Sequence, residues 1–399
     1  MKRFSKLIYS FLPLMSVALF AACSSQNNAA NNSANNPTSG TNTDTRFAAA
    51  KGCKNIGVLL PESDSSARYE AYDRPLLEKE IKAQLPDATI QYANANNNAD
   101  TQQNQAEAAL TKGACILVVD PQDSDKASVI VQKAKASQVP VIAYDRFIQD
   151  PDVAYYVSFD NVRVGELQGQ YIADQFRRGA YGLKPGANLV MINGSQTDNN
   201  ALQFREGALK ALQPLVDSKQ LNLVFDQYTP NWDNARAQSI MEGILTQQRN
   251  NVQAAYVAND GMANTVIAAL RAQKLDGKVL VTGQDATLTG IQNILTGDQA
   301  MTIYKPIAKE AQVTAQLVAA LSKGSEPGAI VNGQTALKSG GQVASALITP
   351  VAVDKTNVQQ TVLADGYLNK AQVCNGLSGD TTGICRGVAQ EGSDRQGSL

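Results

Sequence analysis

The sequence predicts an α/β fold made of two doubly wound lobes, each built around a parallel sheet. Short apolar runs alternate with segments of helical period from residue 55 to residue 145. The same alternation begins again near residue 164 and continues to residue 285. Strands that alternate with helices along a chain form parallel sheets through right-handed crossovers. The chain has 399 residues, which is enough for two such lobes and for tails.

Each alternation predicts individual strands and helices. Apolar runs between turn signals are typical of strands that are buried on both faces. The first predicts strands at 55–61, 88–94, 115–121 and 139–145, and helices at 68–85, 101–113 and 125–138. The second predicts strands at 187–194, 221–228, 252–260 and 278–285, and helices at 164–178, 199–215, 234–248 and 262–273. Two further apolar runs, at 297–306 and 345–353, are predicted to be strands that cross between the lobes.

The N-terminus has the features of an export signal and not of a folded element. Basic residues precede an apolar run over 7–20, which is too short to span a membrane comfortably. Small residues then precede Cys23, so that 1–23 resembles a bacterial lipoprotein signal in which Cys23 is lipidated. A secretory signal with a later cleavage site is the alternative. Both interpretations place the protein outside the cytoplasm, and the first anchors it to the membrane.

A low-complexity segment follows the signal. Residues 24–50 are rich in Asn, Ser and Thr and contain few large apolar side chains. Such a composition cannot bury a core, so a disordered tether is predicted. Residues 391–399 are expected to form a tail. The sequence therefore predicts a globular protein held on a flexible tether.

The remaining cysteines are even in number, which in an oxidising compartment favours disulfides. Cys53 and Cys115 each lie just before a predicted strand, and they can form a disulfide if those strands are parallel neighbours. Cys374 and Cys385 enclose a short stretch rich in turn residues and are the second predicted pair. Unpaired buried thiols are the alternative.

The charge balance and the absence of histidine exclude several classes of function. The chain has 35 Lys and Arg against 36 Asp and Glu, so no basic face for nucleic acid is expected. It has no histidine, which excludes Ser-His-Asp triads, Cys-His pairs and His-ligated zinc sites. It also lacks an acidic calcium-binding loop, so we expect no metal and no cofactor. These features favour a binding protein over an enzyme.

Polar side chains follow the carboxyl ends of successive predicted strands in both alternations. Ligands of open α/β sheets bind beyond these ends, so two facing lobes would direct such side chains into one cleft. Carboxylates, amides and cations can together bond the hydroxyl groups of a sugar, and an aromatic ring can cover its apolar face. The candidate ligands are Arg68, Tyr69, Asp145, Arg146, Asp198, Asn200, Trp232, Asn259, Asp285 and Lys305.

Each candidate also has a purely structural interpretation. Asp145 and Arg146 can form a surface ion pair, Asp198 can cap the following helix, and Trp232 can belong to the core. A retaining glycosidase would need two carboxyl groups about 5 Å apart, one of them able to donate a proton. The nearby Arg and Lys side chains are expected to lower the pKa of the aspartates at the strand ends, Asp260 included. That expectation argues against a glycosidase.

Several motifs together resemble one family. The stretches VIAYDRFI, YYVSFDNVRVGELQGQ, TDNNALQFREG, TGQDATLTGIQ and MTIYKPI occur in this order. They resemble the xylose-binding members of bacterial ABC sugar importers, which are periplasmic binding proteins of type I. The resemblance runs from about Ile56 to Lys370 and implies that Arg205 is also a sugar ligand. It implies that Tyr69 and Trp232 stack on the sugar, although the family usually has Trp where Tyr69 stands.

The resemblance and the strand pattern also imply how the molecule is divided. Three hinge crossings are expected near 159–163, 302–306 and 345–350. The expected lobes are 51–160 plus 306–344 at the N-terminal side, and 161–305 plus 345–390 at the C-terminal side. The implied function is capture of an aldose, with D-xylose favoured, by closure of the lobes and delivery to an ABC permease. A monomer is expected.

The same features leave other functions open. The protein could bind another monosaccharide, such as glucose, ribose or arabinose, or serve as a component of a chemosensory sugar receptor. A sugar-responsive regulator of the same fold would need a DNA-binding helix-turn-helix where this chain has its export signal. A secreted glycosidase is the remaining alternative.

Overall fold

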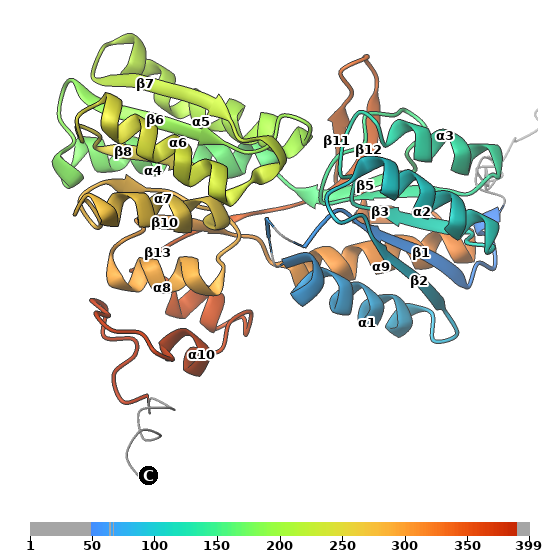
Figure 1. Cartoon of the computed structure of the whole chain (residues 1–399). Helices are drawn as coiled ribbons and strands as arrows, with labels where there is room; N and C mark the ends of the chain where they lie inside the picture. The colour runs from blue at the N-terminus through green and yellow to red at the C-terminus, as the bar shows by residue number, and fades with distance from the viewer. Residues whose placement is uncertain (1–48, 64, 67, 389–399) are drawn as a thin grey trace, which may run out of the picture. The chain divides into compact units, whose positions relative to one another are not determined.

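The structure is a computed structural model that describes residues 49–388, except 64 and 67. The predicted signal with Cys23, most of the predicted tether and the tail at 391–399 lie outside these residues. The described residues belong to one compact unit, drawn in Figure 1. The end of the predicted tether is folded, because Ala50 is buried in a hydrophobic cluster of the first lobe.

The first lobe contains a seven-stranded sheet in the order β11-β12-β5-β4-β3-β1-β2. Its strands are β1 (Asn55–Leu60), β2 (Thr89–Asn94), β3 (Ile116–Val119), β4 (Val141–Tyr144), β5 (Tyr155–Phe159), β11 (Gly333–Ala336) and β12 (Gln342–Ile348). Its helices are α1 (Arg74–Gln84), α2 (Ala99–Thr111), α3 (Ser128–Ala136) and α9 (Ile307–Lys323). All strand pairs are parallel except β11–β12. One buried cluster contains residues of α1 and α9 and another contains residues of α2 and α3, so helices cover both faces of the sheet.

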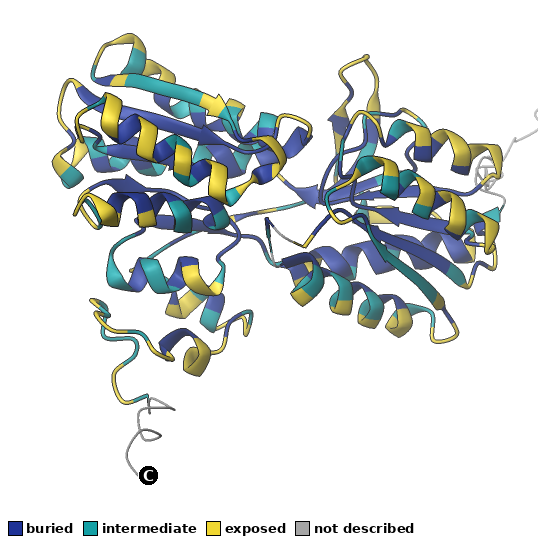
Figure 2. Ribbon diagram, in the orientation of Figure 1, coloured by how far each residue is buried: buried dark blue, intermediate teal, exposed yellow. Residues whose placement is uncertain are grey.

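The second lobe contains a four-stranded parallel sheet in the order β7-β6-β8-β9 and a two-stranded antiparallel sheet, β10-β13. Its strands are β6 (Ala187–Asn193), β7 (Leu221–Tyr228), β8 (Ala254–Val257), β9 (Leu280–Val281), β10 (Met301–Tyr304) and β13 (Val351–Asp354). Its helices are α4 (Asn161–Arg177), α5 (Asn199–Asp217), α6 (Asn234–Gln247), α7 (Asp260–Ala272), α8 (Leu288–Thr296) and α10 (Lys370–Cys374). Figure 2 shows that the inner strands are buried, whereas the edge strand β7 is partly exposed. The predicted α/β fold of two lobes is confirmed.

Three segments connect the two lobes. Asp160 joins β5 to α4, residues 305–306 join β10 to α9, and residues 349–350 join β12 to β13. The third connection corrects the expected lobe boundary at 344/345. Residues 345–348 belong to β12, which pairs with β5 in the sheet of the first lobe as far as Ile348. The chain therefore leaves the first lobe only after Ile348.

Some local structure differs from the sequence-based expectation. Strands β5 and β11 were not among the predicted strands, and β11 lies at the sheet edge, where it pairs with β12. The helix expected from residue 68 begins as a π-helical turn, η2 (Tyr69–Asp73). Pro75 lies in the first turn of α1 and has no N–H to donate, so a regular α-helical ladder cannot continue across it.

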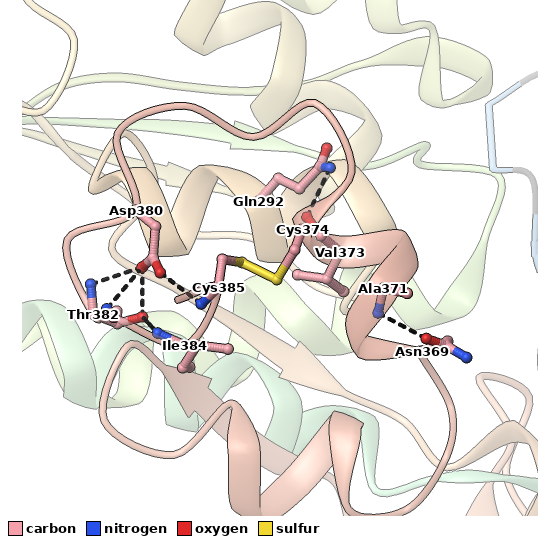
Figure 3. The surroundings of a disulfide bond; sticks show 10 residues. Gln292, Asn369, Ala371, Val373, Cys374, Asp380, Thr382, Ile384 and Cys385 are labelled. Carbon is pink, nitrogen blue, oxygen red and sulfur yellow. Dashed lines mark hydrogen bonds between the residues drawn. A yellow bond between two sulfur atoms is a disulfide. The ribbon is translucent and has the colours of Figure 1, made fainter. Parts of the chain in front are cut away.

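Both predicted disulfides are present. Cys53 and Cys115 are bonded next to the starts of β1 and β3, which are parallel neighbours. Cys374 and Cys385 are bonded in the C-terminal part of the chain, after α10 has begun (Figure 3). The first disulfide connects two strands of one sheet, and the second closes a loop in a region with little regular structure.

Helices α4 and α5 approach each other so closely that the contact requires glycine. A Cβ atom at Gly165 would lie 1.8 Å from the carbonyl oxygen of Phe204, and one at Gly207 would lie 1.9 Å from that of Val162. Backbone atoms cannot rotate away as a flexible side chain can. The two glycines therefore fix the spacing of the helices and the position of the first turns of α5.

We expect Gly165→Ala to lower the free energy of unfolding by about 2 kcal/mol, because overpacking against backbone forces the helices apart. Urea denaturation measures this change. Gly243→Ala in α6 is the matched control, since no atom lies within 4 Å of the position of its Cβ. The control should raise the free energy of unfolding by about 0.5–1 kcal/mol. Equal effects of the two substitutions would contradict the packing argument.

Candidate sugar-binding site

One pocket lies where the strand ends of the two lobes meet. Including the part open to solvent, it holds about 310 Å³ of space not filled by atoms. Its lining residues are Ser65, Ser66, Arg68, Tyr69, Asp145, Arg146, Asp198, Asn200, Phe204, Trp232, Asn259, Gln284, Asp285 and Lys305. Every predicted ligand except Arg205 is therefore brought to this pocket. Ser65, Ser66, Phe204 and Gln284 were not among the predicted ligands.

Arg68 is buried at the start of the π-helical turn and is surrounded by carboxylates. Its Nε and Nη2 donate to the two oxygens of Asp73 at 2.9 and 2.6 Å, and Nη2 also donates to Glu310 at 3.0 Å. Its Nη1 donates to Asp145 Oδ1 at 3.2 Å. Asp73 and Glu310 were not predicted as site residues. They neutralise the buried guanidinium and fix its plane through charge-assisted bonds.

Tyr69 forms an aromatic wall between two guanidinium groups. The Cζ atoms of Arg68 and Arg146 lie 5.3 and 5.4 Å from the centroid of its ring. Its hydroxyl donates to Asp145 Oδ2 at 3.3 Å and accepts from Arg146 Nη2 at 3.1 Å. Burial raises the pKa of the Tyr69 hydroxyl, so the group stays protonated and remains a donor.

The backbone of Asp145 is held in a strained conformation directly after β4. Its φ is 52°, in the left-handed region that non-glycine residues seldom adopt. Its carbonyl oxygen accepts hydrogen bonds from Tyr156 Oη at 2.9 Å, Ser158 Oγ at 2.7 Å and Asn200 Nδ2 at 2.9 Å. Tyr156 and Ser158 belong to β5, whereas Asn200 belongs to the second lobe. This one carbonyl therefore joins the two lobes.

The carboxylate of Asp145 stays ionised. Burial alone would raise its pKa, but Arg68, Lys305 and Arg146 outweigh burial and lower the pKa to about 2. Lys305 Nζ lies 3.5 Å from Asp145 Oδ1 and 3.3 Å from Asp285 Oδ1, so it bridges carboxylates of different lobes. Asp145 can therefore accept hydrogen bonds but cannot act as a proton donor near neutral pH.

Asp198 both caps a helix and lines the pocket. Its Oδ1 accepts from the backbone N–H of Asn200 at 2.9 Å at the start of α5, and its Oδ2 accepts from Trp232 Nε1 at 3.1 Å. Arg146 Nε lies 3.1 Å from Asp198 Oδ2, but not at a hydrogen-bonding angle. The expected lowering of the Asp198 pKa is wrong, because burial raises the pKa and Arg146 compensates only in part.

Trp232 forms the aromatic wall of the second lobe. Its ring packs on Gly194, where a Cβ atom would lie 2.1 Å from the indole, and its centroid is 6.4 Å from that of Phe204. Trp232 has a φ of 56°, and Asp285 has a φ of 96°. Such backbone conformations cost about 1–3 kcal/mol each and gather at functional sites. Asp145, Trp232 and Asp285 therefore reach the pocket from strained backbone conformations.

Arg205 and Asp260 serve structural roles outside the pocket. Arg205 was predicted to be a sugar ligand, but it does not line the pocket. Its Nε instead donates to Asp226 Oδ1 at 2.9 Å. Asp260 accepts from Gln299 Nε2 and Thr302 Oγ1, each at 2.8 Å, and thereby anchors β10. Burial raises the pKa of Asp260 to about 7, so the expected lowering is wrong here as well.

Four lining residues carry buried polar atoms that have no hydrogen-bond partner among the described residues. These atoms are Ser66 Oγ and Arg146 Nε in the first lobe, and Gln284 Oε1 and Asp285 Oδ1 in the second. Arg146 Nε and Asp285 Oδ1 have ion-pair contacts with Asp198 and Lys305 at 3.1 and 3.3 Å, but none of the four atoms has a hydrogen bond. Since buried polar atoms nearly always have one, a ligand can supply it. Because they include donors and acceptors on both lobes, they suit a ligand that carries hydroxyl groups around a ring.

Comparison with known proteins agrees with this geometry. The periplasmic binding protein domain family matches residues 56–326. The D-xylose-binding periplasmic protein of Escherichia coli strain K12 is 39% identical over 324 residues, which cover 81% of this chain and 94% of the relative. The chain belongs to the type I periplasmic binding proteins.

Other relatives of this periplasmic binding protein are named for several sugars or were solved with a different sugar. A multiple sugar-binding periplasmic receptor of Rhizobium radiobacter is 34% identical over 346 residues, covering 82% of this chain and 94% of the relative. A solute-binding protein of an ABC transporter from Clostridium phytofermentans, solved with β-D-glucose, is 30% identical with a TM-score of 0.71. That match covers 80% of this chain and all of the solved chain.

Among residues 49–388, with the two gaps, no group of three or more Cys, Asp or Glu side chains is arranged to hold a metal ion. In the same part of the chain no helix combines the length and apolarity that crossing a bilayer requires.

The low pKa of Asp145 makes part of the protein's stability depend on pH. The folded pKa of about 2 lies below the ordinary value of 3.8, so the ionised form stabilises the fold above the ordinary value. This contribution should disappear as the pH falls from the ordinary value towards the folded one. We expect a loss of about 2 kcal/mol in the free energy of unfolding over that interval. Urea denaturation at a series of pH values measures it.

The Asp145→Asn variant should not show this loss, because it has no carboxyl group to titrate. Asp87→Asn is the matched control, since it also removes an aspartate that pairs with a cation, but in an exposed ion pair of little energetic value. A stability difference between the wild type and Asp145→Asn that is the same at every pH would contradict the lowered pKa.

Proposed function

We propose that this protein captures an aldose outside the cytoplasm, with D-xylose as the preferred sugar, and delivers it to an ABC permease. The set of unpartnered polar atoms in the pocket carries the proposal. A sugar hydroxyl both donates and accepts, so a ring of hydroxyls can satisfy Arg146 Nε and Asp285 Oδ1 alike. Relatives that are 39% and 36% identical are named D-xylose-binding proteins, which supports xylose.

The charge of the pocket favours a neutral ligand. Its lining includes three cationic side chains, Arg68, Arg146 and Lys305, and three carboxylates, Asp145, Asp198 and Asp285. Each cation also has a buried carboxylate within 4 Å, including Asp73 and Glu310 beside Arg68, which lie outside the lining. An ionic ligand would leave one buried charge without a counterion, which is costly in a poorly solvated site.

Two aromatic walls suit the apolar C–H faces of a sugar ring. Tyr69 comes from the first lobe and Trp232 from the second. An aromatic face buries such C–H groups well, and both rings are held by polar contacts at their edges. The smaller ring of Tyr69, compared with the usual Trp, leaves more room beside the sugar.

Capture would occur by closure of the lobes about the three connections at residues 160, 305–306 and 349–350. Several hydrogen bonds join the lobes around the pocket. Gln149 Nε2 donates to Asn199 Oδ1 at 2.9 Å, and Asn234 Nδ2 donates to the carbonyl of Ser65 at 3.3 Å. These contacts support a closed form in which the pocket is shielded from water.

A different monosaccharide is the second candidate ligand. The relative from Clostridium phytofermentans was solved with β-D-glucose, and that from Rhizobium radiobacter is named a receptor for multiple sugars. The word receptor in the name of the Rhizobium radiobacter relative also favours a chemosensory role as an alternative to transport. Neither alternative changes the pocket residues that we assign to the sugar.

The binding function requires no reaction. A glycosidase would need a carboxyl group that donates a proton to the leaving oxygen, and Asp145 with a pKa of about 2 cannot do so. Asp198 has a raised pKa, but it already accepts bonds from Asn200 and Trp232. We therefore expect incubation with aryl glycosides to release no coloured product.

Calorimetry with D-xylose should give a dissociation constant near ~1 μM. We expect Asp285→Ala to weaken this binding by about 100-fold or more, because it leaves hydroxyls of the buried sugar without their charged acceptor. A panel of D-xylose, D-glucose, D-ribose and L-arabinose ranks the sugars in the same experiment. Millimolar binding of every sugar would contradict the proposed function.

Asp226→Ala is the matched control for Asp285→Ala. It also removes an aspartate of the second lobe that pairs with a cation, here Arg205, but it lies outside the pocket. Its sugar affinity should equal that of the wild type. A loss of affinity in both variants would show that the effect of Asp285→Ala is not specific to the pocket.

We also propose that Cys23 is lipidated and anchors the protein to the membrane, because small residues and an apolar run precede it as in a lipoprotein signal. The relatives named periplasmic proteins support only a location outside the cytoplasm. The Cys23→Ser variant should fail to incorporate a labelled fatty acid and should be released into the soluble fraction. Labelling of expressing cells followed by membrane fractionation measures both. An unlabelled wild-type protein would favour the plain secretory signal.

A further inference from the structure

The C-terminal segment, defined as residues 355–388, contacts backbone that carries pocket residues, although none of its own residues lines the pocket. The segment is fastened to α8 at two points. Gln292 Nε2 donates to the carbonyl of Val373 at 3.0 Å, as Figure 3 shows, and the N–H of Thr381 donates to the carbonyl of Leu295 at 2.9 Å. The Cys374–Cys385 disulfide closes a loop that begins directly after Val373 and contains Thr381.

Tyr367 extends from this segment to two backbone stretches that carry pocket residues. Its hydroxyl donates to the carbonyl of Asp285 at 3.2 Å. Its ring centroid lies 5.1 Å from that of Tyr304, the residue before Lys305. Tyr304 in turn donates its hydroxyl to Asp365 of the same segment. The segment therefore holds the turn of Asp285 and the strand end of Lys305 in a fixed relation.

Tyr367 also contacts the other lobe. Its ring centroid lies 4.8 Å from that of Tyr72, at an interplanar angle of 33°. Tyr72 belongs to the π-helical turn of the first lobe, between the wall residue Tyr69 and Asp73, the partner of Arg68. Rotation of the lobes about the three connections would separate the two rings. The ring pair is therefore a contact of the closed form.

We propose that Tyr367 is a positioning residue of the pocket: its hydroxyl fixes the turn of Asp285, and its ring holds the lobes closed through Tyr72. This inference rests on the proposed sugar-binding function. A ligand that binds only the closed form gains apparent affinity in proportion to the population of that form. Aromatic pairs of this kind change such populations by about three- to tenfold.

A double-mutant cycle tests the ring contact. Tyr72→Leu and Tyr367→Leu should each weaken D-xylose binding in calorimetry, by at least about three- to tenfold. The double variant should bind no more weakly than Tyr367→Leu alone, because the contact is already lost. Effects that multiply in the double variant, or Tyr72→Leu binding as tightly as the wild type, would overturn the inference.

A second pair of variants isolates the hydroxyl. Tyr367→Phe removes the donor to the carbonyl of Asp285, and Tyr171→Phe removes an equivalent donor to the carbonyl of Ala300 at 3.1 Å, away from the pocket. Both should lower the melting temperature of the sugar-free protein to a similar extent. Only Tyr367→Phe should also weaken sugar binding, by about fivefold. Equal sugar affinities of the two variants would overturn the positioning role.

Small-angle scattering without sugar separates this inference from the proposed function. Tyr72→Leu should have a larger radius of gyration than the wild type, because its closed form is less populated. If the wild type bound none of the sugars while this difference persisted, the proposed function would be wrong and the ring contact would stand. If the wild type bound sugar but the two proteins scattered identically, only the inference about closure would be wrong.

Discussion

The pocket depends first on how Asp145 ends strand β4. Its carbonyl accepts three hydrogen bonds, two from β5 and one from Asn200 of the second lobe. Three such bonds, at about 0.5–1.5 kcal/mol each, can offset the cost of about 1–3 kcal/mol for its left-handed backbone. The same conformation turns the carboxylate towards Arg68 and Lys305. One strained residue thus fixes both the contact between the lobes and the central acceptor of the pocket.

The strand-end rule predicted most of the pocket because it depends only on topology. In two parallel sheets the residues after each strand share one edge, whatever the details of side-chain packing. Arg205 was inferred from a motif and not from this rule. At about 100° per residue, five positions after Asn200 lead to a different face of α5, whereas Phe204 shares the face of Asn200 and lines the pocket. Helical geometry applied to the motif would have favoured Phe204.

The partners of Arg68 show what the sequence could not provide. Glu310 lies 242 positions further along the chain, on α9, and only the crossing of the chain back into the first lobe brings it to Arg68. Asp73 lies five positions from Arg68, which a regular α-helix would turn to another face. The π-helical turn bonds residues five apart and so aligns the two side chains. Apolar periodicity in the sequence indicates neither the π-helical turn nor the return of the chain into the first lobe. The partners of Arg68 therefore could not be predicted from it.

The unpartnered polar atoms also explain why ligand binding and closure would be coupled. A buried polar atom without a hydrogen bond costs up to about 1–3 kcal/mol until a ligand supplies the bond. The ion pairs of Arg146 Nε and Asp285 Oδ1 offset only part of this cost. Arg146 Nε belongs to the first lobe and Asp285 Oδ1 to the second, so no ligand held by one lobe alone can satisfy both. The binding free energy of a ligand that spans them is therefore realised only when the lobes meet. A pocket that is incompletely bonded without its ligand therefore stabilises the closed form further when a neutral polyol fills it.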